Sequence, residues 1–434
     1  MEWKIGMRVK HKQLGYGIIK EINGNQVHLA LENYNQYKFP ASIEDLDVPK
    51  GNLSRKKTIE ALRFGLVPQE EIERLTIGYG LLKEWVDFHL DRLEYSQPTV
   101  SVIHGPFGTG KSHALEITRY IAYQRGFLIA SAEVDGQHIS LAKPSKLFGE
   151  IARTLKGKDF ETEIPLYELF FHTIHNGNPK PHLFRQEDWL GANYDLIKQI
   201  QQTNLREELA EDVEKVLSGN DEVDSIRIIK DQIRKYPWFS GRGIEVMPVF
   251  TRSSQVEEFL KALIGYAYLA RLIGRKGLVI TIDEVEVESS ILPPSERRKA
   301  IMLLDRLWSY FEDQKDEYPN APFALIFATV EDDSEINQVI DHLVEKSGGR
   351  PYELPYYKLD ELIALGREIT DLYKEAYFIP IENDTDLMQE IISRFADRIY
   401  QNNGVIRDFI KSFMHELDRR YGPPRRIGNE RGTV

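Results

Sequence analysis

The chain has 434 residues, of which 41% are hydrophobic and 29% charged, and its formal net charge is −12 at pH 7. This length predicts two or three domains, and the acidic charge disfavours a protein that coats nucleic acid with its whole surface. With no cysteine, the sequence excludes disulfides, thiolate metal sites and cysteine nucleophiles. No apolar run reaches bilayer length, and the first residues lack a signal-peptide core, so we expect a cytoplasmic protein.

Residues 1–50 predict a small β-barrel module. The dipeptide Asn23-Gly24 lies between the β-rich runs 18–22 and 26–31, and such a dipeptide is typical of a tight hairpin because both turn positions need positive φ. We expect three to five short strands. A Pro-Gly segment, 49–52, is predicted to close the module as a linker.

The rest of the chain predicts an α/β ATPase core between helical segments. Residues 51–97 predict a helical lead-in, 98–355 the core, and 356–434 a C-terminal helical lid. Strands that alternate with helices favour a parallel sheet. The predicted strands are 99–103, 127–130, 278–282, 323–328 and 352–354, with a helical insertion at about 155–265 and lid helices near 359–378, 384–400 and 404–420.

A phosphate-binding loop is the most specific motif. Residues 105–112 fit G-x-x-x-x-G-K-[ST], follow a predicted strand and open a predicted helix. We expect Lys111 to reach the β- and γ-phosphates and the Ser112 hydroxyl to ligate Mg²⁺. The alternative is a glycine turn with a surface lysine. The predicted nucleotide contacts in this segment are Gly105, Pro106, Phe107, Gly108, Thr109, Gly110, Lys111, Ser112 and His113.

An acidic pair follows the third strand of the predicted core. Asp283 at the strand end is predicted to hold Mg²⁺. Glu284 is predicted to activate the attacking water as general base. A strand that simply ends in solvated acids is the alternative. Glu286 and Glu288 lie nearby and are interpreted as surface acids, although either one could replace Glu284 as the base.

Three further residues have candidate catalytic or nucleotide-sensing roles. Thr329 ends the fourth strand, where it could sense the γ-phosphate or position water; a plain strand terminus is the alternative. Arg407, in the G-x-x-R that opens the last helix, could fold over the phosphates, or it is a surface arginine. Arg350, just before the fifth strand, could act as an arginine finger across a subunit interface. Arg297, Arg298 and Arg306 compete for that role.

The histidines and basic clusters carry weaker signals. His172, His175 and His182 lack a carboxylate at metal-ligand spacing, so we interpret them as core or surface residues. His104 and His113 flank the phosphate loop and are expected to shape it. The densest basic clusters could contact nucleic-acid phosphates or form solvated faces; they are Arg55-Lys56-Lys57 and Arg419, Arg420, Arg425, Arg426 and Arg431.

The loop, the acidic pair, the polar fourth strand and the G-x-x-R helix together resemble AAA+ ATPases, in particular replication initiators and loaders. Within that class, about 53–420 resembles the ATP-binding proteins of BREX-type phage-defence operons. This narrower resemblance rests on Ser54–Gly65, Gly105–Ser112, Gly404–Asp408 and Phe409–Asp418. It implies an AAA+ fold, a function that depends on ATP and Mg²⁺, and a helicase or nuclease partner that is encoded nearby.

The first module departs from that family pattern. Gly6–His11 and Leu14–Ile19 resemble Tudor-like or SH3-like barrels, such as those at the end of UvrD-type helicases and in CarD-like regulators. In those proteins the module contacts RNA polymerase or other proteins. The resemblance therefore implies a docking role.

We expect an ATP-hydrolysing AAA+ protein of an anti-phage defence system that acts on DNA with partner proteins and forms a homo-oligomer on ATP binding. The second hypothesis is a nucleotide-gated switch that oligomerises and activates an effector. DNA-stimulated ATPase activity would separate the two, because the first hypothesis expects it and the second need not. A metabolic P-loop kinase is disfavoured by the insertion, the lid and the acidic pair. The absence of an N-K-x-D motif favours ATP over GTP.

Overall fold

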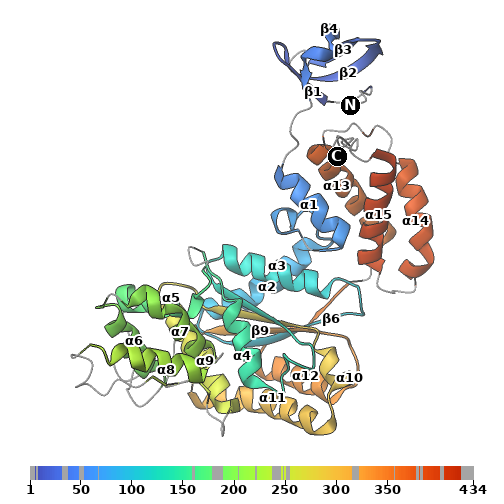
Figure 1. Ribbon diagram of the computed structural model, residues 1–434. Helices are drawn as coiled ribbons and strands as arrows, with labels where there is room; N and C mark the ends of the chain where they lie inside the picture. The colour runs from blue at the N-terminus through green and yellow to red at the C-terminus, as the bar shows by residue number, and fades with distance from the viewer. Residues whose placement is uncertain are drawn as a thin grey trace, which may run out of the picture. The chain divides into compact units, whose positions relative to one another are not determined.

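The computed structural model divides into two compact units (Figure 1). The first comprises Met1–Tyr79, Phe107–Thr109 and Pro355–Val434, and the second comprises Gly80–Pro106 and Gly110–Leu354. None of the helices in the described part of the chain is long and apolar enough to cross a membrane. The residues described are 5, 8–31, 38–47, 53–66, 68–158, 162–177, 189–203, 205–219, 222–236, 246–247, 249–250, 255–314, 322–355, 357–377, 381, 385–400 and 405–421.

The N-terminal module is a five-stranded antiparallel sheet with the order β4-β3-β2-β1-β5. Asn23 pairs with Gln26 across the predicted hairpin, and Gly24 has the positive φ of 63° that such a turn requires. The five strands agree with the predicted number, whereas the likeness to Tudor or SH3 barrels stays a prediction. The predicted linker, 49–52, lies outside the described residues. The strands are β1 (Arg8–His11), β2 (Gly15–Asn23), β3 (Gln26–Leu31), β4 (Lys38–Ser42) and β5 (Leu46–Asp47).

A helical bundle with its own apolar core forms the rest of the first unit. Arg63 near the end of α1 donates to the Asp418 carboxylate of α15 at 2.7 and 2.5 Å, and the Tyr373 hydroxyl of α13 donates to the same carboxylate at 2.8 Å. The segment predicted as one lead-in is thus divided, since α1 lies in this unit and α2 (Tyr79–Glu94) lies, from Gly80 on, in the other. The bundle helices are α1 (Leu53–Phe64), α13 (Leu359–Tyr377), α14 (Thr385–Tyr400) and α15 (Val405–Tyr421).

A five-stranded parallel sheet is the centre of the second unit, in the order β10-β6-β9-β8-β7. Strands β6 and β9 are buried along their whole length, as expected where helices cover both faces. The order places β9 between the strand that leads into the phosphate loop and the strand that ends in Asp283. All five predicted strands are present: β6 (Thr99–His104), β7 (Leu128–Glu133), β8 (Leu278–Asp283), β9 (Phe323–Thr329) and β10 (Tyr352–Glu353).

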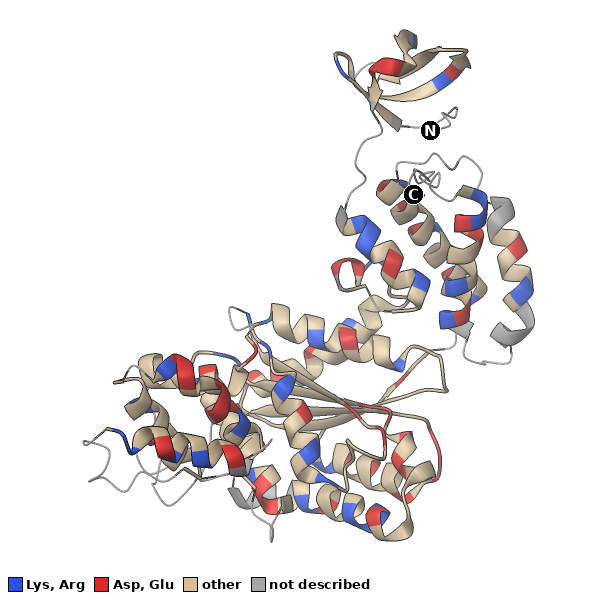
Figure 2. Ribbon diagram, in the orientation of Figure 1, with Lys and Arg blue, Asp and Glu red and all other residues tan. Residues whose placement is uncertain are grey.

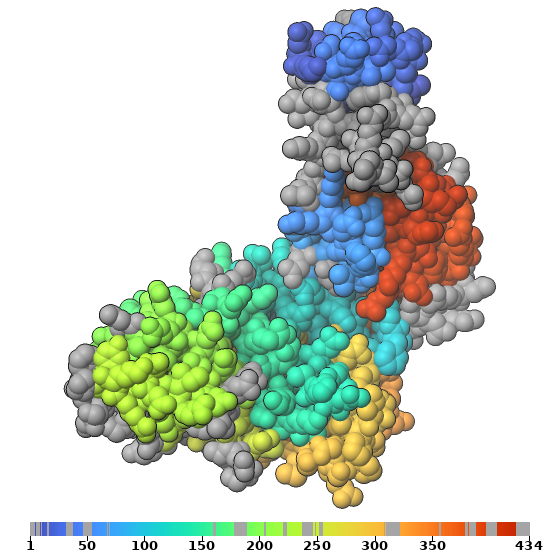
Figure 3. Space-filling view, viewed as in Figure 1, coloured from blue at the N-terminus to red at the C-terminus, as the bar shows by residue number. Residues whose placement is uncertain are grey.

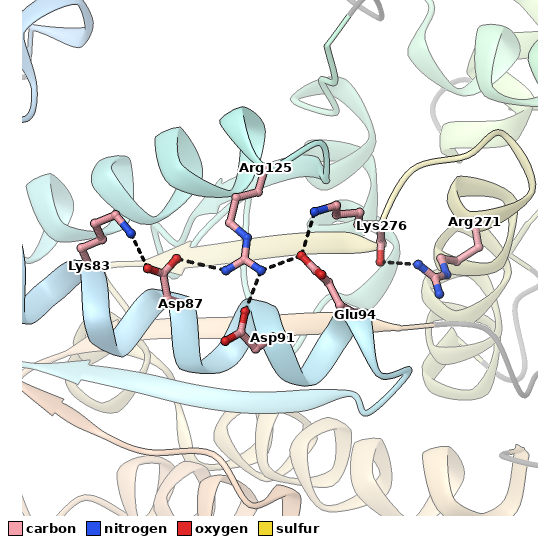
Figure 4. A network of polar contacts seen from close by, with 7 residues as sticks. All are labelled: Lys83, Asp87, Asp91, Glu94, Arg125, Arg271 and Lys276. Carbon is pink, nitrogen blue, oxygen red and sulfur yellow. Dashed lines mark hydrogen bonds and ion pairs between the residues drawn. The ribbon is translucent and has the colours of Figure 1, made fainter.

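Helices cover the sheet on both sides. Figure 1 shows α3 (Lys111–Gln124) on one side and α12 (Glu335–Ser347) on the other. Arg125, just after α3, bonds to Asp87, Asp91 and Glu94 of α2, and Lys276 bonds to Glu94 as well (Figure 4). This network joins α2 to the end of α3 and to Lys276, which precedes β8. The further helices around the sheet are α4 (Pro144–Arg153), α10 (Glu286–Ile291) and α11 (Pro294–Gln314).

The insertion between β7 and β8 is helical, as predicted. Its last helix, α9, also packs on β8 and β9 and so belongs partly to the core. Figure 3 shows α6 to α8 as one continuous surface, and Figure 2 shows acidic and basic residues interspersed along these helices. The inserted helices are α5 (Pro165–Asn176), α6 (Trp189–Ile200), α7 (Arg206–Ser218), α8 (Glu222–Ile233) and α9 (Gln255–Leu272).

Candidate nucleotide-binding site

The predicted phosphate loop connects the end of β6 to the start of α3. Gly108 and Gly110 have φ of 75° and 105°, values that residues with a side chain rarely adopt, so the loop needs glycine at these two positions. The Gly105 N–H bonds to the Thr329 carbonyl at 3.3 Å, which ties the loop to the neighbouring strand β9. A glycine-rich turn that opens a helix directs backbone N–H groups and the helix dipole toward a bound phosphate.

The other loop residues differ in exposure. Phe107 is 64% exposed, whereas Thr109 is buried. The Tyr357 hydroxyl donates to the Thr109 carbonyl, and both residues belong to the first unit. Ser112 is half-buried at the second position of α3. Burial lowers the pKa of His113 to about 4, so its imidazole is neutral at physiological pH. Pro106 is exposed.

Lys111 is buried rather than extended into solvent. Its Nζ donates to the Gly105 carbonyl at 3.0 Å and lies 3.0 Å from Oε1 of Glu286. The lysine is thus folded back over its own loop. The alternative of a surface lysine on a glycine turn is wrong, because the side chain is only 7% exposed.

The acidic pair lies at the carboxyl end of β8. Asp283 pairs in register with Glu133 of β7, and its Oδ1 accepts the Glu284 N–H at 2.9 Å. Glu284 has a φ of 60°, which costs free energy in a residue with a side chain and is often found at functional sites. Burial, with the nearby charges of Glu286 and Asp283, raises the pKa of Glu284. A raised pKa makes a carboxylate a better proton acceptor.

The interpretation of Glu286 and Glu288 as surface acids is wrong. Glu286 is 6% exposed and Glu288 is fully buried. Residues two apart on a helix do not share a face, and the two acids are buried by different partners: Glu286 lies against Lys111, and Glu288 lies against Ser140 and Leu141. Sequence reasoning also missed Glu133, although its place at a strand end is the signal that identified Asp283. It missed Tyr357 as well, for which the sequence gives no motif.

The three remaining candidates belong to different elements, and Thr329 is joined to the phosphate loop through its carbonyl, which accepts the Gly105 N–H. The Thr329 hydroxyl is buried and lies 3.0 Å from Asn337 Oδ1. Arg407 is exposed in the first turn of α15, in the first unit, while Gly404 of its motif lies outside the described residues. Arg350 precedes β10, its carbonyl accepts from the Ser101 hydroxyl of β6 at 2.5 Å, and its guanidinium lies 3.8 Å from the centre of the Phe88 ring. Of the competing arginines, Arg306 pairs with Glu257 and Arg297 donates to the Ser289 and Leu292 carbonyls.

The histidines and basic clusters have ordinary partners where they are described. His172 lies 3.8 Å from Glu168, and His175 bonds to the Phe171 carbonyl. Arg55 pairs with Glu71 and Glu375, while Arg419 and Arg420 pair with Glu416. These pairs favour the interpretation of solvated faces over a nucleic-acid contact. His182, Arg425, Arg426 and Arg431 lie outside the described residues.

The oxygen donors of the site suit Mg²⁺. The Ser112 hydroxyl and the Asp283 carboxylate are hard ligands of the kind that Mg²⁺ takes beside phosphate oxygens and water. Within the described ranges, no three acidic or histidine side chains cluster as a self-sufficient metal site. Mg²⁺ that is bound with ATP usually takes its further ligands from the phosphates and from water.

A five-stranded parallel sheet, a phosphate loop that opens a helix and acids at a nearby strand end are the features of a P-loop ATPase fold. Residues 52–176 match the family model described as BREX system ATP-binding protein BrxC/D. The match covers α1 to α5, including the phosphate loop, and ends before the acidic strand β8; it spans less than half of the chain. No curated protein matches the chain.

Proposed function

We propose that this chain binds Mg²⁺-ATP at residues 105–112 and hydrolyses it, as an ATP-binding protein of a phage-defence system. The observation that carries the proposal is the buried Lys111 beside the carboxyl end of β8, with a strained Glu284 whose pKa is raised. The family match over residues 52–176 supports the ATP-binding and phage-defence parts of the proposal.

The residues of the site have separate chemical roles. Lys111 and the N–H groups of the loop neutralise charge on the phosphates, and Ser112 and Asp283 hold the metal, which supplies further charge neutralisation when bound. Glu284 orients the attacking water and accepts its proton. Its raised pKa follows from burial among other acids, and Lys111 partly offsets that rise.

Action on DNA together with a helicase or nuclease, and assembly into a homo-oligomer, are further parts of the proposal. As an arginine finger, Arg350 would complete the site of a neighbouring subunit. Mixing Arg350→Ala subunits with Glu284→Gln subunits should then restore some hydrolysis. A protein that stays monomeric by light scattering with ATP and DNA present would contradict this part.

The direct test is ATP hydrolysis by the purified full chain with and without DNA. We expect Mg²⁺-dependent hydrolysis that DNA stimulates. Hydrolysis that is indifferent to DNA, together with ATP-driven oligomerisation, would favour the nucleotide-gated switch instead. Failure of the chain to bind ATP in a calorimetric titration would contradict the proposed function as a whole.

A further inference from the structure

Glu286 forms an unusual ion pair with the phosphate-loop lysine. Its Oε1 lies 3.0 Å from Lys111 Nζ, and the two side chains are 5% and 7% exposed. Neither oxygen of Glu286 has a hydrogen-bond partner among the described residues. Buried carboxylates normally accept several hydrogen bonds, because desolvation costs more than a single ion pair returns. The stability of the fold alone therefore does not explain this arrangement.

The next acid on the same helix shows the ordinary arrangement. Glu288 accepts from the Ser140 hydroxyl at 3.1 Å and from the Leu141 N–H at 3.0 Å. It thereby fixes the segment after β7 to α10, which is a structural role. Glu286, two residues earlier and equally enclosed, instead directs its charge at the one side chain that ATP must engage. This contrast separates a positioning role at the site from a role in packing.

We propose that Glu286 is the counterion of Lys111 in the nucleotide-free loop and competes with the nucleotide phosphates for the lysine ammonium. This inference rests on the proposed function, because it takes residues 105–112 to be the phosphate site. Glu286 keeps the buried lysine folded and in place before ATP arrives. When phosphates enter, Lys111 exchanges the carboxylate for phosphate oxygens, and the freed carboxylate then opposes the phosphate charge.

Two features of the site make the competition substantial. The pair is shielded from water, so its electrostatic energy is screened far less than that of a surface pair. Glu284 also interacts electrostatically with Lys111 and adds a further acidic group near the same ammonium. Glu286 is therefore a positioning residue that lowers nucleotide affinity, and its loss should tighten binding. A residue with only a structural role would weaken binding when changed, or leave it unaltered.

The test is a titration of the full chain with Mg²⁺-ATP, for the wild type and for Glu286→Gln. Glutamine keeps the shape of the side chain but carries no charge, so it removes the ion pair with Lys111. We expect ATP to bind about tenfold more tightly, equivalent to about 1.4 kcal/mol. Glu288→Gln is the matched control, since it removes a buried charge from the same helix without touching Lys111, and its ATP affinity should equal that of the wild type.

A second variant keeps the test decisive if Glu286→Gln does not fold. Glu286→Asp retains the charge but is one methylene shorter, so it weakens the contact with Lys111 and should tighten ATP binding by a smaller factor. Equal or weaker ATP binding by a folded variant, compared with a wild type that does bind ATP, overturns this inference and leaves the proposed function standing. A wild type that does not bind ATP overturns the proposed function, and this inference with it.

Discussion

The two ends of α3 differ in how their charges are satisfied. At the carboxyl end, Arg125 donates to three partly exposed acids of α2, and one of them, Glu94, also accepts from Lys276 (Figure 4). At the amino end, Lys111 is buried against a carboxylate that accepts no hydrogen bond among the described residues. Both ends hold an ion pair, but only one of them is complete without a ligand.

This difference shows which charged clusters of a fold indicate function. A network whose members accept and donate several bonds stabilises the packing of two helices, and it needs no further partner. A buried pair with unsatisfied oxygens beside a residue of left-handed φ retains a free-energy cost. A fold retains such a free-energy cost at a site where a bound ligand supplies the missing partner. The following predictions test this distinction between the two ends.

Lys111→Ala should produce the largest effect at the amino end. The variant loses the only lysine of the phosphate loop, and we expect ATP binding to become undetectable while the fold persists. Isothermal titration with Mg²⁺-ATP measures the loss, and circular dichroism checks the fold. ATP affinity like that of the wild type would contradict the assignment of the loop.

Glu284→Gln should separate binding from chemistry. The amide still hydrogen-bonds water but cannot accept its proton, so turnover should fall by roughly 10²–10⁴ with ATP affinity retained. Steady-state hydrolysis and an ATP titration measure the two quantities. Asp283→Asn is the comparison, and it should also lose the Mg²⁺-dependent part of the affinity. Hydrolysis by Glu284→Gln at the wild-type rate would show that another acid of the site is the general base.

Arg125→Ala should lower the stability of the fold without changing the affinity for ATP. Removing the guanidinium leaves Asp87 and Glu94, which are partly buried, with one partner fewer, and we expect a loss of about 1–2 kcal/mol in the free energy of unfolding. Urea denaturation measures this change, and an ATP titration should give the wild-type affinity. A tenfold change in that affinity would show that the two ends of α3 are coupled.

Glu214 of α7, which lies at neither end of α3, should make the free energy of unfolding depend modestly on pH. Its carboxylate accepts the Leu166 and Tyr167 N–H groups at the start of α5, and burial raises its pKa from 4.5 to about 7. The folded protein therefore binds this proton more tightly than the unfolded chain, so stability falls as the pH rises from about 4.5 to about 7. Glu214→Gln should flatten that slope, by about 1–3 kcal/mol over the interval. Urea denaturation across this pH range checks it, and an unchanged slope would contradict the assignment.

Much of the fold could be predicted because its signals are local. Apolar runs identified all five strands of the parallel sheet, and helical periodicity placed the lid helices within a residue or so of α13, α14 and α15. The phosphate loop was recognisable because its glycines and lysine occupy fixed positions in a contiguous segment. Asp283 and Glu284 followed from their place at a strand end.

The tertiary structure alone decided how these segments meet. Helix α1 joins α13 and α15 in one bundle through a shared apolar core, to which the bidentate pair of Arg63 and Asp418, 355 residues apart in sequence, adds. The strand order places β9 between the loop strand and the acid strand, which no local pattern specifies. Glu286 looked like a surface acid because charged residues seldom lie buried without several partners. The sequence by itself determined the chemical groups of the site, whereas burial and pairing depend on contacts between distant segments and were decided only by the packing.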